Sequence, residues 1–117
     1  MKCVIIDDNE IARLTIERLI DQAPELEVSG RFSGGFEALR ALKDIPADLL
    51  FLDITMEDMS GIDLVKSLPQ PRPLVIFMTA NSEYALEAFE LNVVDYLVKP
   101  IQPQRFFSGR TKSDAIF

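Results

Sequence analysis

Apolar segments and helical patterns alternate along the chain from its first residues to its last third. Five short segments, rich in β-branched, aromatic and leucine residues, predict β-strands at 2–6, 25–29, 49–52, 74–78 and 95–98. Val4-Ile5-Ile6 and Leu49-Leu50-Phe51-Leu52 are apolar without alternation. Continuous apolar runs of this length are typical of parallel strands that are covered on both faces.

Between these strands, apolar residues recur at the spacing of helices. The stripes are formed by Ala12, Ile16, Leu19 and Ile20, by Phe36, Leu39 and Leu42, and by Ile62, Val65 and Leu68. The first helix is expected to end before Pro24, and the second to begin at Gly34-Gly35 and to stop by Pro46. A fourth helix is predicted from Ser82, a favourable N-cap residue, to about Leu91.

The order of these elements predicts the fold class. Strands that alternate with helices five times favour an α/β fold with a doubly wound, five-stranded parallel sheet and helices on both faces. At 117 residues the chain fits one domain, 1–117, without internal repeats. A last helix could start at Gln102, but Gly109 weakens its pattern, so residues 108–117 are either its end or the start of a linker.

Composition narrows the chemistry. The chain has no histidine and a single cysteine, Cys3, which excludes catalytic triads, His-ligated zinc, disulfides and CxxC sites. Its net charge is −7 with no basic stripe, so this domain is not expected to contact nucleic acid itself. No apolar run approaches 20 residues and no signal-peptide pattern is present, so we expect no membrane contact and a cytoplasmic location.

Polar residues stand where the predicted strands end. Asp7 and Asp8 follow the first strand, Asp53 ends the third, Thr79 ends the fourth and Lys99 follows the fifth. Because ligands bind at the carboxyl ends of parallel strands, we expect these side chains to converge. Three carboxylates without nitrogen or sulfur ligands favour a hard cation, with Mg²⁺ the best candidate. A cation, a lysine and a hydroxyl around a carboxylate predict a phosphoryl-transfer site with the carboxylate as acceptor.

Each of these residues also has a plainer interpretation. Asp7 and Asp8 could end a strand and cap a helix, and Asp53 could belong to a turn. Lys99 could be a solvated surface lysine, and Tyr96 could simply pack against its neighbours. The combination of three acids with a lysine and a threonine at matching strand ends favours the metal site.

The same residues belong to an ordered set of motifs that resembles the receiver domain of bacterial two-component response regulators. The motifs are Ile6-Asp7-Asp8, Leu52-Asp53-Ile54, Met56, Met59-Ser60-Gly61, Met78-Thr79-Ala80 and Tyr96-Leu97-Val98-Lys99-Pro100. The resemblance runs from Lys2 to about Phe107, and it implies the flavodoxin-like fold of that family. The stretches 82–90 and 94–97 further resemble receivers that are attached to LytTR-type (LytR/AlgR-like) DNA-binding domains.

The resemblance implies roles for the site residues. Asp53 would accept the phosphoryl group from a histidine kinase or a small phosphodonor. Asp8, Asp53 and the backbone carbonyl of Thr55 would bind Mg²⁺, with Asp7 acting mostly through water. Lys99 would pair with the phosphoryl group.

The remaining roles concern the switch. Thr79 and the Ala80 N–H would hydrogen-bond to the phosphoryl group, and Tyr96 would turn inward as Thr79 moves. Lys99-Pro100 would be joined by a cis peptide bond. The domain would assist only its own phosphorylation and dephosphorylation rather than act as an independent enzyme.

Two positions depart from, or vary within, the pattern of the family. Residue 57, usually proline, is Glu57, which adds negative charge and flexibility beside the pocket. Asn81 occupies a position that varies among receivers and influences how fast the phosphate is lost.

The helix from Ser82 suggests a partner surface. One face of this helix is expected to be acidic, with Glu83, Glu87 and Glu90. The opposite face is expected to pack, with Ala85, Ala88 and Phe89. A dimer or partner surface is expected where this helix, the last strand and the last helix meet, and it would control a DNA-binding output domain in a longer protein. Ordinary packing of the helix is the alternative.

Two other functions stay open. A pseudo-receiver would bind partners without using phosphate, and Glu57 is the local feature that allows it. A phosphatase of the haloacid dehalogenase type would use Asp53 as nucleophile, but such enzymes carry a second acid two residues later, where this chain has Thr55.

Overall fold

The computed structural model describes residues 1–112, with side chains through Ser108. Its strands form a single parallel sheet in the order β2-β1-β3-β4-β5. The strands are β1 (Lys2–Ile6), β2 (Glu27–Phe32), β3 (Leu49–Asp53), β4 (Leu74–Thr79) and β5 (Asp95–Val98). The helices are α1 (Glu10–Asp21), α2 (Gly35–Ala41), α3 (Gly61–Ser67), the 3₁₀ turn η1 (Ser82–Tyr84), α4 (Ala85–Glu90) and α5 (Pro103–Lys112). The doubly wound fold predicted from the alternating pattern is confirmed.

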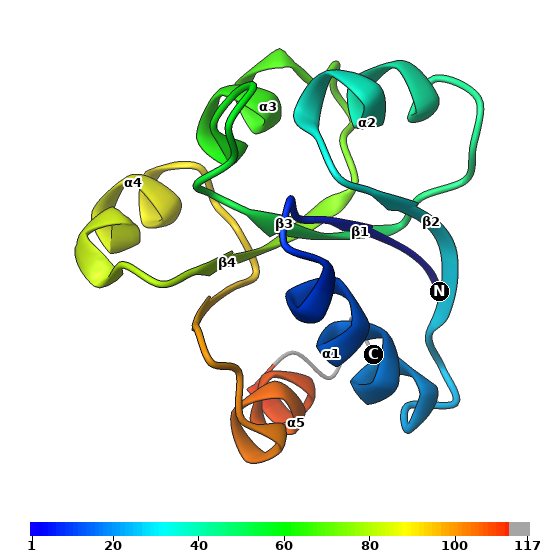
Figure 1. The fold of residues 1–117 in the computed structure, drawn as a ribbon, viewed down its shortest axis with the longest axis vertical. Helices are drawn as coiled ribbons and strands as arrows, with labels where there is room; N and C mark the ends of the chain where they lie inside the picture. The colour runs from blue at the N-terminus through cyan, green and yellow to red at the C-terminus, as the bar shows by residue number, and fades with distance from the viewer. Residues whose placement is uncertain (113–117) are drawn as a thin grey trace.

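The helices cover the sheet in two layers, α1 and α5 on one face and α2, α3 and α4 on the other (Figure 1). Alternate strand residues supply the two cores: Cys3 and Ile5 face α1, whereas Val4 and Ile6 face α2 and α3. Because both faces are buried, β1 and β3 are apolar at residues 3–6 and 49–52, which explains their uninterrupted apolar runs.

Aromatic packing attaches α5 to the sheet. The ring of Phe106 stacks on the wholly buried Phe51 of β3, with centroids 5.7 Å apart and an interplanar angle of 15°. Burial of a side chain of this size contributes about 1.5–3 kcal/mol. This contact helps α5 to continue through Gly109 to Lys112, so residues 108–112 belong to the helix. Residues 113–117 lie outside the described residues.

The second strand begins two residues later than the sequence predicts. Pairing with β1 places Lys2 opposite Glu27 and Ile6 opposite Phe32, so β2 includes the polar residues Ser29 and Arg31. It is an edge strand, and its half-exposed side chains do not produce the apolar run by which the central strands are recognised.

The fourth helix differs most from the prediction. Asn81, not Ser82, caps the segment, and a 3₁₀ turn precedes an α-helix of six residues. This short helix contacts the core along a narrow line, and only Ala88 in it is buried. Ala88 is buried as predicted, but Ala85 is exposed and Phe89 is 80% exposed, so the predicted packing face is wrong for these two residues.

Two further features concern the backbone and the membrane. The Lys99-Pro100 bond is cis, as the resemblance implies, and Gln70-Pro71 is also cis. Within residues 1–112 the longest helices are too short and too polar to cross a bilayer.

Candidate functional site

The carboxyl ends of two neighbouring strands bring three aspartates into one cluster. Asp7 and Asp8 follow β1 directly, and Asp53 is the last residue of the adjacent β3. One carboxylate oxygen from each of them lies within 4.8 Å of the others. Asp7 and Asp53 are buried, whereas Asp8 is exposed, so the cluster opens to solvent on the side of Asp8. The convergence predicted from the strand ends is therefore present.

Asp7 is held by the start of α1. Its Oδ1 accepts the N–H of Asn9 at 2.9 Å, and Asn9 in turn caps α1 by accepting the N–H of Ala12. The guanidinium of Arg13, one turn into the helix, donates to the backbone carbonyl of Asp7. Asn9 and Arg13 were not singled out from the sequence, because a cap and a helical arginine are common without any site.

Lys99 lies between two of the aspartates. Its Nζ is 2.8 Å from Asp7 Oδ2 and 3.6 Å from Asp53 Oδ2. Its backbone N–H donates to the carbonyl of Thr79 at 2.8 Å, which ties the end of β5 to the end of β4. Lys99 is thus closer to Asp7 than to Asp53, the predicted phosphoryl acceptor.

The environment of Asp53 favours its neutral form. Burial and the negative charge of Asp7 raise the pKa of Asp53 from 3.8 to about 6, although Lys99 and the N–H of Thr55 oppose the shift. The Thr55 N–H lies 3.2 Å from Asp53 Oδ1. At neutral pH the site therefore holds an ionised carboxylate whose charge is incompletely compensated, and a bound cation would stabilise it.

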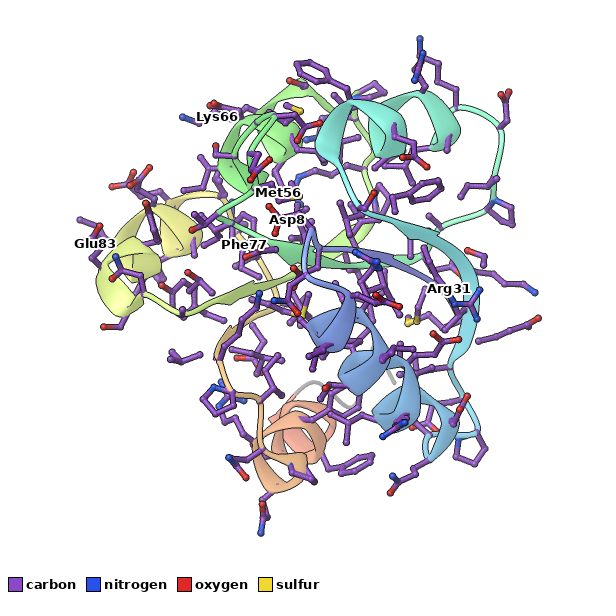
Figure 2. The ribbon with its side chains drawn as sticks, in the orientation of Figure 1. Asp8, Arg31, Met56, Lys66, Phe77 and Glu83 are labelled. Carbon is purple, nitrogen blue, oxygen red and sulfur yellow. The ribbon has the colours of Figure 1, made fainter. Side chains whose placement is uncertain are left out.

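Asp8 connects the site to the loop after β3. The N–H of Glu57 is 3.3 Å from Asp8 Oδ2, and in the view of Figure 2 Asp8 is labelled below α3. The Glu57 side chain is exposed. A proline at this position would have no N–H, so this contact depends on the departure from the family pattern noted above.

Gly61 allows α3 to approach the end of β3. A Cβ atom at this position would lie 2.5 Å from the carbonyl oxygen of Asp53 and 3.0 Å from Cα of Ile54. The Gly61 N–H donates to the carbonyl of Ile54 at 2.8 Å. The loop that surrounds Asp53 is therefore closed by backbone contacts that only glycine permits.

Thr79 and Tyr96 meet at Asn81. The wholly buried Thr79 accepts the N–H of Asn81 at 3.1 Å through its hydroxyl, and the half-buried Tyr96 donates its O–H to the carbonyl of Asn81 at 2.6 Å. Burial raises the pKa of Tyr96. The predicted switch pair is thus linked through one residue of the β4–α4 loop.

Tyr96→Phe is expected to lower the free energy of unfolding by about 1 kcal/mol, because it removes the hydrogen bond to Asn81 and keeps the ring. Urea denaturation measures the change. Tyr84→Phe is the control, since the Tyr84 hydroxyl forms no hydrogen bond with another described residue. Equal losses in the two variants would contradict the prediction.

The donor set fits a hard divalent cation. The cluster offers three carboxylates and neither nitrogen nor sulfur, which suits Mg²⁺ better than zinc or copper. Asp7, Asp8 and Asp53 are the carboxylates that could hold it. The Thr55 carbonyl, assigned from the resemblance, stays a predicted ligand.

Comparison with known proteins identifies the family of the chain. The family model described as the response regulator receiver domain matches residues 3–108. An uncharacterized response regulatory protein of Vibrio cholerae is 40% identical over 106 residues, which are 90% of this chain and 45% of that protein. The transcriptional regulatory protein BtsR of Escherichia coli K12 is 39% identical over 106 residues, 90% of this chain and 44% of its own length.

A solved structure is similar throughout. The response regulatory domain of mrkE from Klebsiella pneumoniae superposes with a TM-score of 0.90 at 32% identity, covering 98% of this chain and 96% of that domain. The chain spans a little under half the length of the curated relatives that it matches. By its motifs, its fold and the match over residues 3–108, this chain belongs to the response regulator receiver domain family.

Proposed function

We propose that this chain is a single receiver domain that acts as a phosphorylation-dependent switch, with Asp53 as the phosphoryl acceptor. The observation that supports this most strongly is the burial of Asp53 beside two other carboxylates and a lysine at one sheet edge. An isolated structural aspartate needs no such surroundings. A carboxylate that must carry a phosphoryl group requires cations close by.

The transfer uses Asp53 as nucleophile. One of its carboxylate oxygens attacks the phosphorus of a phosphohistidine on a kinase, or of a small phosphodonor, and the bond from phosphorus to the donor breaks with its electron pair. Mg²⁺, when bound, compensates negative charge on the carboxylates and on the phosphoryl oxygens. The chain thereby assists its own phosphorylation and dephosphorylation without turning over an independent substrate.

Lys99 and Thr79 respond to the new charge. Phosphorylation adds about −1.5 to −2 charge and strong acceptor oxygens. Lys99, already 3.6 Å from Asp53, can exchange Asp7 for the phosphoryl group, and the Thr79 hydroxyl can donate to it. Movement of Thr79 disturbs its bond with Asn81, which also holds Tyr96, so Tyr96 reports the change to the surface.

The surface that changes is formed by α4, β5 and α5. Leu86 on α4 is 68% exposed, and Phe89 on α4 and Val98 on β5 are also exposed. Large exposed apolar side chains on neighbouring elements are suited to a partner or a second copy of the chain. We assign this surface to dimerisation or to control of an output domain.

The output is proposed to be a DNA-binding domain of the LytTR type in a longer protein. The length of the relatives and the description of BtsR as a transcriptional regulatory protein support this assignment. The domain itself carries a net charge of −7, so DNA contact would fall to the attached domain. A histidine kinase would supply the phosphoryl group.

Intact mass after incubation with acetyl phosphate tests the proposal. One labile phosphoryl adduct is expected with Mg²⁺, none with EDTA, and none in Asp53→Ala. Asp63→Ala, which removes an exposed acid from α3, is the control and should retain the adduct. If no adduct forms and beryllofluoride also fails to bind, the switch is excluded and the pseudo-receiver becomes the better description.

A further inference from the structure

The loop between β3 and α3 is fastened to α2 by Asp58. Oδ1 of Asp58 accepts the N–H groups of Gly35 at 3.0 Å and of Met59 at 2.9 Å, and Oδ2 accepts the N–H of Phe36 at 3.0 Å. Gly34, the N-cap residue of α2, has no side chain with which to cap the helix. The cap is therefore supplied by a carboxylate more than 20 residues later in the chain.

Both segments are shaped for this contact. A Cβ atom at Gly34 would lie 3.0 Å from Asp58 Oδ2, and one at Gly35 would lie 2.3 Å from Cγ of Met59. The Gly34-Gly35 pair at the start of α2 thus lets the loop reach the first N–H groups of this helix. The three hydrogen bonds lower the pKa of Asp58, so the carboxylate stays ionised at neutral pH.

The other end of the same loop lies at the acidic cluster. Glu57, the residue before Asp58, donates its N–H to Asp8, and Thr55 donates its N–H to Asp53. Residues 55–58 therefore contact two of the three clustered aspartates at one end and α2 at the other. No comparable contact from another described element holds Asp8.

We propose that Asp58 is a positioning residue, which fastens the loop to α2 so that Glu57 orients Asp8 for the cation. This inference rests on the proposed function, since it concerns the Mg²⁺ site of the switch. It assigns no contact with the ion to Asp58 itself. Partners that orient metal ligands typically influence metal affinity by about 10- to 100-fold, and at this remove we expect the lower figure.

The test is the Mg²⁺ dissociation constant of the whole chain, measured by NMR titration of the backbone amides. Asp58→Ala is expected to weaken Mg²⁺ binding about tenfold. Asp63→Ala is the matched control because it removes the same charge from an exposed carboxylate that forms no hydrogen bond or ion pair with another described residue. Asp58→Asn keeps one acceptor oxygen and should recover part of the affinity.

A second pair of variants separates the loop contact from the stability of α2. Glu57→Pro deletes the N–H that holds Asp8 and leaves the cap of α2 in place, so it should weaken Mg²⁺ binding as Asp58→Ala does. Glu57→Ala keeps the N–H and should bind as Asp63→Ala does. This pair remains informative if Asp58→Ala fails to fold.

The amides of Gly35 and Phe36 supply a readout that a merely structural role would not move. Their NMR signals should shift when Mg²⁺ is added to the unmodified chain. In Asp58→Asn the same signals should shift less, even at saturating Mg²⁺. Affinities of Asp58→Ala and Glu57→Pro within twofold of Asp63→Ala would overturn the inference while leaving the metal site intact. Failure of the unmodified chain to bind Mg²⁺ would overturn both the inference and the proposed site.

Discussion

Asp53→Asn is expected to stabilise the domain in the absence of Mg²⁺ and to eliminate its phosphorylation. The substitution keeps the shape of the side chain and its acceptor for the Thr55 N–H, but it removes a buried negative charge that faces Asp7. A shift of the pKa from 3.8 to about 6 corresponds to at most about 3 kcal/mol, because one unit is about 1.4 kcal/mol. We expect a gain of that order at pH 7.5 in EDTA.

The pH dependence has a definite sign. Between pH 3.8 and about 6 the folded chain holds a proton on Asp53 that the unfolded chain has released. The contribution of Asp53 to stability is therefore greatest below pH 3.8 and decreases as the pH rises through about 6. Asparagine has no such titration, so the difference between the two proteins should be small at pH 4 and largest above pH 6.

Urea denaturation of both proteins across this pH range, with EDTA and with excess Mg²⁺, measures these effects. Mg²⁺ should stabilise the unmodified domain more than Asp53→Asn, since ligands stabilise the state that binds them. Titrating groups that do not interact with Asp53 cancel in the comparison. A variant that is less stable than the unmodified chain at pH 7.5 in EDTA, or a difference that does not change with pH, would contradict the expectation.

Gly61→Ala is expected to destabilise the domain by about 3 kcal/mol and to weaken Mg²⁺ binding. The added methyl group would lie 2.5 Å from the backbone carbonyl of Asp53, so α3 must move away from β3 or the backbone of the site must shift. Overpacking against a well-packed region typically costs about 1–3 kcal/mol, and a backbone neighbour that cannot rotate away places this case at the upper end.

Gly30→Ala is the matched control for this prediction. The nearest atoms to its Cβ would be the ends of the Ile45 and Phe32 side chains, at 2.9 Å, and these can rotate. We expect it to lose less stability and to leave Mg²⁺ binding unchanged. Thermal unfolding and Mg²⁺ titration measure both effects. Similar losses of stability and of Mg²⁺ affinity in the two variants would contradict the prediction that a Cβ beside the Asp53 carbonyl disturbs the site.

Sequence patterns predicted best the strands that the neighbouring elements bury on both faces. β1 and β3 are buried on both faces, and continuous apolar runs are typical of such strands. β2 and α4 were predicted less well, because the side chains of the edge strand are only partly buried and the six-residue helix buries only Ala88. Of the six residues of α4 only Ala88 is buried, so the narrow contact of this short helix with the sheet leaves Phe89 exposed whatever its apolar pattern.

The candidate site divides in the same way. Asp7, Asp8, Asp53, Thr79 and Lys99 could be identified because each stands at the end of a recognisable strand. Their assigned roles remain predictions until the chemistry is measured.

The sequence by itself determined the order of strands and helices, the α/β fold and the set of polar residues at the strand ends. It could do so because burial and chain connectivity constrain these features locally. Only the tertiary structure decided that Lys99 pairs more closely with Asp7 than with Asp53, that Glu57 holds Asp8, and that Asp58 caps α2. These contacts join segments that are 22 to 92 residues apart in the chain, so they depend on how the packed elements are placed and not on any local pattern.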